Sequence, residues 1–181
     1  MDAPLVWLLA ALAVLFFWML GAHNRVVALR SPINAAWAQL EAVLAARRQA
    51  LAELLVAAEP RLAGERAALD AVVQAQAQVG RAADALRGKP ADAERVAALA
   101  QAETALAPVL ARLCSLIEQQ PDWREEPALA GPLQALRELP ARWQFARQVF
   151  NEASSAYNDA VLQFPTRLLA GVFRFGRAGT L

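Results

Sequence analysis

Residues 3–22, APLVWLLAALAVLFFWMLGA, form a run without a single charged side chain. At about 1.5 Å per helical residue, about 20 residues span the roughly 30 Å of hydrocarbon in a bilayer. A cleavable signal peptide would carry basic residues ahead of its apolar core, whereas only Asp2 precedes this one. A buried core helix is the other alternative, but it rarely stays uncharged on every face over this length. The run therefore predicts a membrane anchor, with Trp7 and Trp18 near the two interfaces.

The charges that flank this run predict its orientation. Arg25 and Arg30 follow it closely, and the short stretch before it has no Lys or Arg. Because basic residues concentrate on the cytoplasmic side, we expect a single-pass protein of the cell (inner) membrane with its C-terminal domain in the cytoplasm.

Composition limits both the fold and the chemistry. Hydrophobic residues make up 57% of the 181, and Ala, Leu, Arg and Glu are abundant, which predicts an all-α fold. A net charge of +1 gives no basic face for nucleic acid. One histidine and the lone Cys114 leave no internal disulfide, no metal-ligand spacing and no nucleophile with its base. We therefore expect no enzyme, no cofactor and no metal site.

Helical periodicity and helix breakers divide the rest of the chain. Ser31-Pro32 marks either a helix start or a mild kink in a helix continuous with the anchor. Breaks are expected near Pro60 and at Gly88-Lys89-Pro90, and Pro108 should kink the helix that starts at Asp92. The first stripe after the anchor has apolar residues three and four positions apart: Ile33, Trp37, Leu40, Leu44, Leu51, Leu54, Leu55 and Ala58.

The segment Pro121 to Pro132 is predicted to be the longest connection, followed by a long helix that starts at Pro140, with Leu136 and Leu139 on a preceding short turn. This part of the chain has the most regular apolar seam: Leu136, Leu139, Trp143, Ala146, Phe150, Ala153, Tyr157, Ala160 and Phe164. Such a seam packs against partner helices in a bundle or coiled coil.

These segments predict an elongated antiparallel bundle behind one N-terminal transmembrane helix. We expect four helices, up-down-up-down, which would return the C-terminal tail to the anchor; three long helices are the alternative. The expected divisions are an anchor with its juxtamembrane segment (1–30), the bundle (31–164) and a basic, aromatic tail (165–181).

The stretch 145–175 closely resembles the C-terminal signature of LemA family membrane proteins. The resemblance rests on Phe145-Ala146-Arg147-Gln148, Asn151, Tyr157-Asn158, Phe164-Pro165 and Leu168 through Phe173. Near the anchor it continues through Asn24, Leu29-Arg30, Ala36-Trp37, Gln39, Glu41, Leu44 and Arg47. The chain departs from the family pattern at His23, at Leu51-Ala52-Glu53 and at Pro140.

The resemblance implies an elongated helical bundle behind a single anchor, with no established enzymatic activity. Family members often occur beside membrane proteases or other envelope proteins. We therefore expect a non-enzymatic scaffold or adaptor whose partners are the lipid bilayer, membrane or envelope proteins such as a membrane protease, or further copies of the chain.

Polar residues near the last seam are the candidate structural or recognition residues, since burying an unpartnered polar group costs about 1 to 3 kcal/mol. Arg147, Asn151, Tyr157 and Asn158 are expected to fix the register of the packed helices or to recognise a partner. Trp37 is interpreted as core packing, with ligand binding as the alternative.

The tail contains apolar residues and arginines but no acid. Arg167, Phe173, Arg174 and Phe175 are the candidate membrane-interface residues, because aromatic and basic side chains suit that environment. The same apolar residues could instead cap the end of the bundle. The alternative function is therefore a membrane-shaping or lipid-binding protein that acts through this tail.

Overall fold

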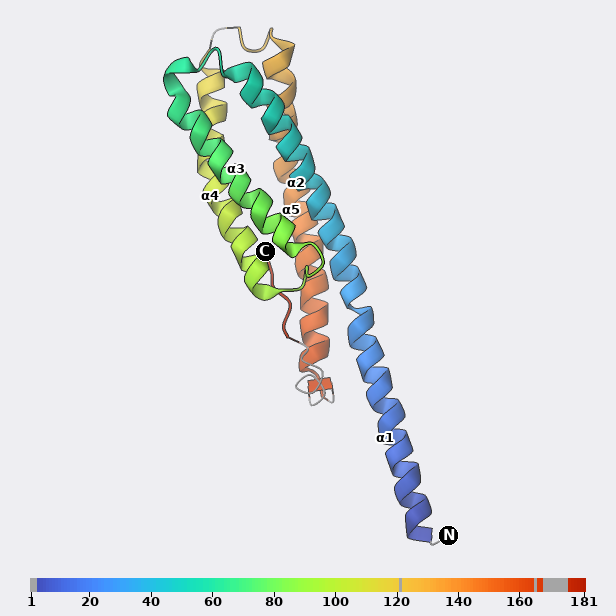
Figure 1. Ribbon diagram of the computed structural model, residues 1–181. Coiled ribbons are helices and arrows are strands. Elements are labelled where there is room, and N and C mark those ends of the chain that lie inside the picture. Colours follow the sequence, from blue (N-terminus) through green and yellow to red (C-terminus); the bar gives the residue numbers. More distant parts are fainter. Residues whose placement is uncertain (1–2, 121, 165, 168–175) are drawn as a thin grey trace.

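The computed structural model describes residues 3–120, 122–164, 166–167 and 176–181. Its elements are α1 (Ala3–Ala28), α2 (Arg30–Ala58), a short 3-10 turn η1 (Ala63–Glu65), α3 (Arg66–Leu86), α4 (Ala93–Glu118) and α5 (Pro127–Leu162). The described part is an elongated four-helix bundle, α2 to α5, from which α1 extends alone (Figure 1). The all-α prediction and the preference for four helices over three are confirmed.

Helix α1 contains the uncharged run, and its apolar side chains are exposed along almost its whole length. The most apolar 18-residue window of the 4–58 helical stretch has a mean hydropathy of 2.4 and none of it is buried. By length and composition this helix can cross a membrane. Helix α4 also meets that test, at a mean hydropathy of 1.2, but it packs along α3 within the bundle.

Helices α1 and α2 form one nearly continuous rod, as one of the two interpretations of Ser31-Pro32 predicted. Leu29, between α1 and α2, keeps helical dihedral angles, and its N–H donates to the Arg25 carbonyl at 3.2 Å. Pro32 sits in the first turn of α2, where a missing N–H costs little because such groups lack an intrahelical partner anyway.

The chain reverses at the two expected breaks. Pro60 ends α2, and η1 leads into α3. The second reversal uses Gly88 at φ 82°, a conformation that glycine adopts without steric cost, and α4 then begins under an Asp92 cap that accepts the Arg95 N–H at 3.2 Å.

Helix α5 begins earlier than predicted. The expected start at Pro140 is wrong: Pro127 occupies the first turn, and Pro132 and Pro140 lie inside a helix of 36 residues. Each internal proline costs about 3 kcal/mol. Burial of Leu129, Leu133, Leu136 and Leu139 offsets this cost, at roughly 1.5 to 3 kcal/mol for each fully buried side chain. Local sequence signals do not include that tertiary gain.

The bundle consists of two helix pairs, α2 with α5 and α3 with α4 (Figure 1). Their apolar faces form one core whose largest fully buried side chains include Ile33, Leu40, Leu54, Leu99, Leu113, Phe150 and Tyr157. The final member of the predicted α5 seam is different: Phe164 is 80% exposed. Helix α5 ends beside α1, as the up-down-up-down arrangement requires.

Candidate functional site

Two asparagines of α5 hold the returning C-terminal segment by its backbone. The Asn158 side-chain amide donates to the Ala178 carbonyl at 3.0 Å and accepts the Ala178 N–H at 2.7 Å. Asn151 makes the same pair of bonds with Leu181, both at 2.8 Å. Each amide therefore satisfies one backbone donor and one backbone acceptor, as a neighbouring strand would.

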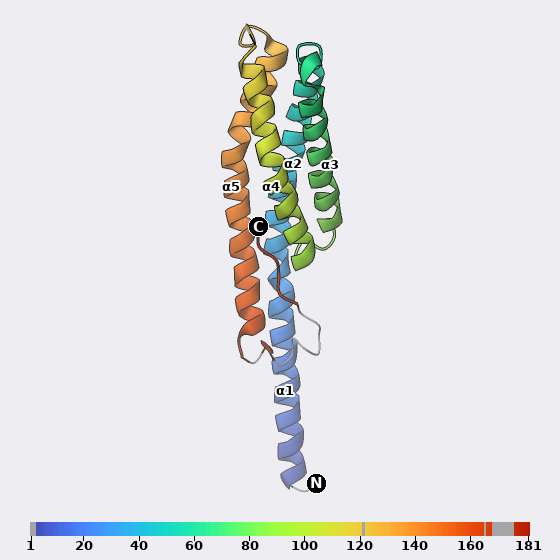
Figure 2. The ribbon, with the colours of Figure 1, turned by 90° about the vertical axis from the view of Figure 1, so that its left-hand side faces the viewer.

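The spacing of the two asparagines matches that of their backbone partners. Seven residues of helix advance about 10.5 Å along the axis. Three residues of extended chain advance about 10 Å. The segment 176–181, which we call the docked tail, therefore runs antiparallel to α5 in register with both asparagines (Figure 2).

The opposite edge of the docked tail contacts the turn between α3 and α4. Ala178 forms an antiparallel bridge with Asp92, and the Gly179 N–H donates to the Ala91 carbonyl at 3.3 Å. A β-carbon added at Gly179 would lie 2.7 Å from Val96 Cβ and 2.9 Å from Ala93 Cα. Only glycine therefore fits between the tail and α4.

The structure brings three of the predicted α5 residues to this place. Tyr157 is buried one residue before Asn158, whereas Arg147 is exposed one helical turn before Asn151. Trp37 is 5% exposed in the core, and its indole N–H has no partner among the described residues. The docking of residues 176–181 was not part of the sequence prediction, because an amide that binds a distant backbone leaves no local pattern.

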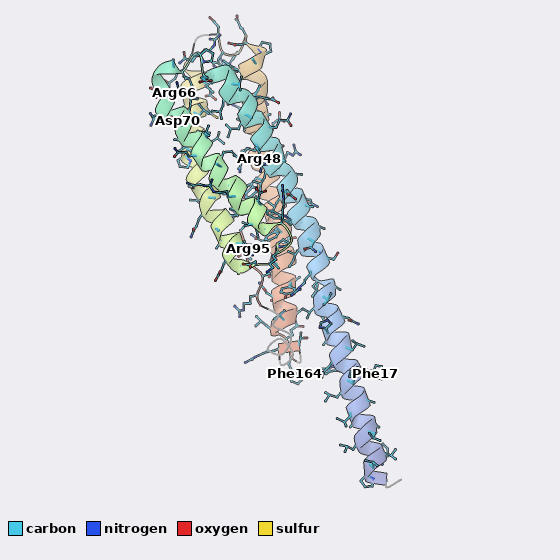
Figure 3. The ribbon with its side chains drawn as sticks, in the orientation of Figure 1. Phe17, Arg48, Arg66, Asp70, Arg95 and Phe164 are labelled. Carbon is cyan, nitrogen blue, oxygen red and sulfur yellow. The ribbon has the colours of Figure 1, made fainter. Side chains whose placement is uncertain are left out.

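The predicted interface residues are only partly placed. Arg167 is exposed, whereas Phe173, Arg174 and Phe175 lie outside the described residues. Phe164 lies at the level of Phe17 on α1 (Figure 3). It borders a shallow apolar groove on α1 with Trp7, Ala10, Ala11, Val14, Leu15 and Trp18. The end of α5 therefore lies beside the apolar run of α1. The periodic spacing placed Phe164 in the core, and that prediction is wrong.

A second hollow, which we call the central cleft, opens between α2, α4 and α5. Its volume is about 590 Å³, within the range of ligand pockets, and its apolar wall consists of Val43, Leu106, Ala107, Leu110, Ala111, Cys114, Leu136, Leu139, Pro140 and Trp143. A thiol, several aliphatic groups and an indole thus share one surface, which suits an apolar guest.

The polar edge of the central cleft is built around Arg47. Its guanidinium forms a two-point ion pair with Glu103, with one N–H donating at 2.7 Å, and lies 5.9 Å from the centre of the Trp143 ring. Its Nε is buried and has no partner among the described residues.

The chemistry of the cleft does not favour nucleophilic attack. Burial, reinforced by the charge of Glu118, raises the pKa of the Cys114 thiol above its usual range. The unreactive thiol form is therefore favoured at neutral pH. Across the residues that the structure describes, no three His, Cys, Asp or Glu side chains group closely enough to hold a metal ion.

Fold and surface together define a helical bundle on an apolar N-terminal helix, with its C-terminal segment clamped to α5. The model of the LemA family matches residues 36–181, which include most of α2, all of α3 to α5 and the docked tail, and the chain belongs to the LemA family. No curated protein and no solved structure matches the chain.

Proposed function

We propose that this protein is a non-enzymatic adaptor anchored in the cell membrane by α1, with its bundle in the cytoplasm, and that the central cleft binds a cytoplasmic helix of another membrane protein. The observation that supports the proposal best is the cleft itself, where an apolar wall adjoins the Arg47–Glu103 ion pair. Aromatic and arginine side chains, such as Trp143 and Arg47 of this cleft, are typical of the residues that dominate binding energy at interfaces.

The position of the cleft supports this type of partner. Val43 follows the apolar run by 21 residues, a rise of about 32 Å along a continuous helix. Lipid tails do not reach that height, whereas a helix rising from a neighbouring membrane protein does. Arg25 and Arg30, just after the anchor, support the cytoplasmic side.

Photocrosslinking from the cleft tests the proposal. The full chain in its native membrane would carry p-benzoylphenylalanine in place of Trp143, which lines the cleft, or of Phe145, which is 66% exposed two residues further on and does not line it. We expect one recurrent membrane-protein adduct from position 143 and none from position 145. Leu110→Asp, which adds a charge to the cleft wall, should abolish that adduct.

Equal adducts from both positions would contradict a cleft-specific partner. An adduct at twice the chain mass would assign the cleft to a second copy, which would make the protein a self-assembling scaffold.

A second candidate function is lipid binding at the end of α5, favoured by the position of Phe164 beside the apolar run. Its test uses Cys114→Ala chains with one fluorophore-labelled cysteine at position 164 or, as a control, at 59, in nanodiscs with nitroxide lipids. Quenching at 164 but not at 59 is expected. Equal, weak quenching at both would rule out membrane contact at this end.

A further inference from the structure

A basic hollow lies where the beginning of α2, the turn between α3 and α4, the end of α5 and the docked tail meet. Its volume is about 620 Å³. The polar side chains that line this basic pocket are Arg30, Asn34, Lys89, Asp92, Tyr157 and Arg177. It is separate from the central cleft, which shares none of its lining residues.

Positive charge exceeds negative charge in the basic pocket. Arg30, Lys89 and Arg177 contribute three cations against the carboxylate of Asp92. That carboxylate already accepts the backbone N–H of Arg95 and forms an ion pair with its guanidinium at 3.4 Å. The side chains of Lys89 and Arg177 form no ion pair with any described residue.

The side chain of Tyr157 also lines the basic pocket. Tyr157 is only 1% exposed, and its hydroxyl forms no hydrogen bond with a described residue. A tyrosine hydroxyl can donate a hydrogen bond to an oxygen of a bound anion. Ala93, at the positive end of the 26-residue helix α4, lies on the same wall.

We infer that the basic pocket binds a phosphate group, carried by a lipid headgroup or by a soluble phosphate ester. A phosphate monoester carries a charge of about −1.5 to −2 at pH 7 and three strong acceptor oxygens. Those oxygens can accept from Lys89, Arg177 and Tyr157, which approach from three separate segments. A carboxylate, with two oxygens in one plane, fits such divergent donors less well.

Both sources of phosphate are within reach of this position. Arg30 follows the apolar run by eight residues, about 12 Å along the helix. The headgroup layer extends about 5 to 7 Å beyond the hydrocarbon, so the Arg30 backbone lies about 5 to 7 Å above that layer, a gap that a long arginine side chain spans. A soluble ester enters from the aqueous side.

Phosphate binding and tail docking are coupled by geometry. Gly176 and Arg177 line the pocket, and they are placed there because Asn158 holds the next residue, Ala178. A bound phosphate therefore stabilises the docked tail, and release of the tail removes one cation from the site.

The test uses Lys89, the only lysine in the chain. The full-length protein in neutral phosphatidylcholine nanodiscs is treated with a lysine-acylating reagent, and the labelling rate of the peptide containing residue 89 is followed by mass spectrometry. The probes are inorganic phosphate, glycerol 3-phosphate and nanodiscs containing phosphatidic acid, with chloride at matched ionic strength as the control.

We expect at least a fivefold slower acylation of Lys89 with a phosphate probe than with chloride. Protection by phosphatidic acid alone assigns a lipid headgroup, whereas protection by the soluble probes assigns a soluble ester. Tyr157→Phe, which keeps the ring in the core, and Arg177→Gln should each weaken protection about tenfold, and Arg167→Gln, outside the pocket, should not.

If chloride slows the acylation of Lys89 as much as the phosphate probes do, the inference is overturned, because the effect is then general screening of charge by salt. Unchanged protection in both Tyr157→Phe and Arg177→Gln would overturn it as well. If circular dichroism shows that Tyr157→Phe does not fold, Arg177→Gln alone decides, since Arg177 is exposed and outside the core.

Discussion

Asn158 pairs with both backbone groups of Ala178, twenty residues away, donating to its carbonyl at 3.0 Å and accepting its N–H at 2.7 Å. With the equivalent Asn151–Leu181 pair, this contact fixes the docked tail along α5 and completes the wall of the basic pocket. Asn151 and Asn158, which the sequence predicted as polar residues near the α5 seam, therefore bind the docked tail.

Asn158→Ala should release the docked tail. Loss of both amide bonds leaves the Ala178 backbone groups without their partners, at about 1 to 3 kcal/mol. Hydrogen exchange should show faster exchange of the Ala178 and Leu181 amides, with little change in the helix amides. Gln78→Ala, on the exposed face of α3, is the control. Unchanged exchange at Ala178 would mean that the tail is held elsewhere.

Gly179→Ala should also displace the tail, by a steric route. The added β-carbon would lie 2.7 Å from Val96 Cβ and 2.9 Å from the Ala93 backbone, and such overpacking costs about 1 to 3 kcal/mol. Gly176→Ala is the matched control, because nothing lies within 4 Å of its added carbon. Gly179→Ala should have a lower unfolding temperature and faster hydrogen exchange in the docked tail than Gly176→Ala. Equal unfolding temperatures and exchange rates in the two variants would contradict the close packing at Gly179.

Glu103→Gln should destabilise the bundle. Its partner Arg47 is 12% exposed and would keep an uncompensated buried charge. Removing one partner of a buried ion pair lowers the free energy of unfolding by about 3 kcal/mol or more. Glu65→Gln breaks the exposed 3.5 Å pair with Arg112 and should cost below about 1 kcal/mol. Urea unfolding of both variants measures the difference, and similar midpoints would show that the cleft pair is solvated.

Cys114 should alkylate with a pH midpoint above that of a free thiol, near 8.5, because burial raises its pKa. The folded state then binds the thiol proton more tightly than the unfolded state. The associated stability is fully present below about pH 8.5 and is lost as pH rises through the folded pKa. Iodoacetamide rates between pH 7 and 10, in buffer and in denaturant, test the shift. Coincident profiles would contradict it, and Cys114→Ala should lose this part of the pH dependence of stability.

The amino-acid sequence alone determined the features that depend on local physics. The uncharged length of residues 3–22 determined the apolar helix, and Pro60 and Gly88 determined the reversals, because a missing N–H or a positive φ interrupts a helix where no tertiary packing offsets its cost. Periodic apolar spacing identified most of the α5 face that enters the core, and the motif around Asn151 and Asn158 identified the family.

Tertiary structure decided what depends on distant partners. Pro132 and Pro140 remain inside α5 because burial of neighbouring leucines in the core offsets their cost. Phe164 does not enter the core because the end of α5 lies beside α1 and not against the other bundle helices. The central cleft arises from three helices that are far apart in sequence. The docked tail depends on side-chain amides that bind backbone 20 and 30 residues away, and such contacts form only once the bundle has brought both ends of its last helix into place.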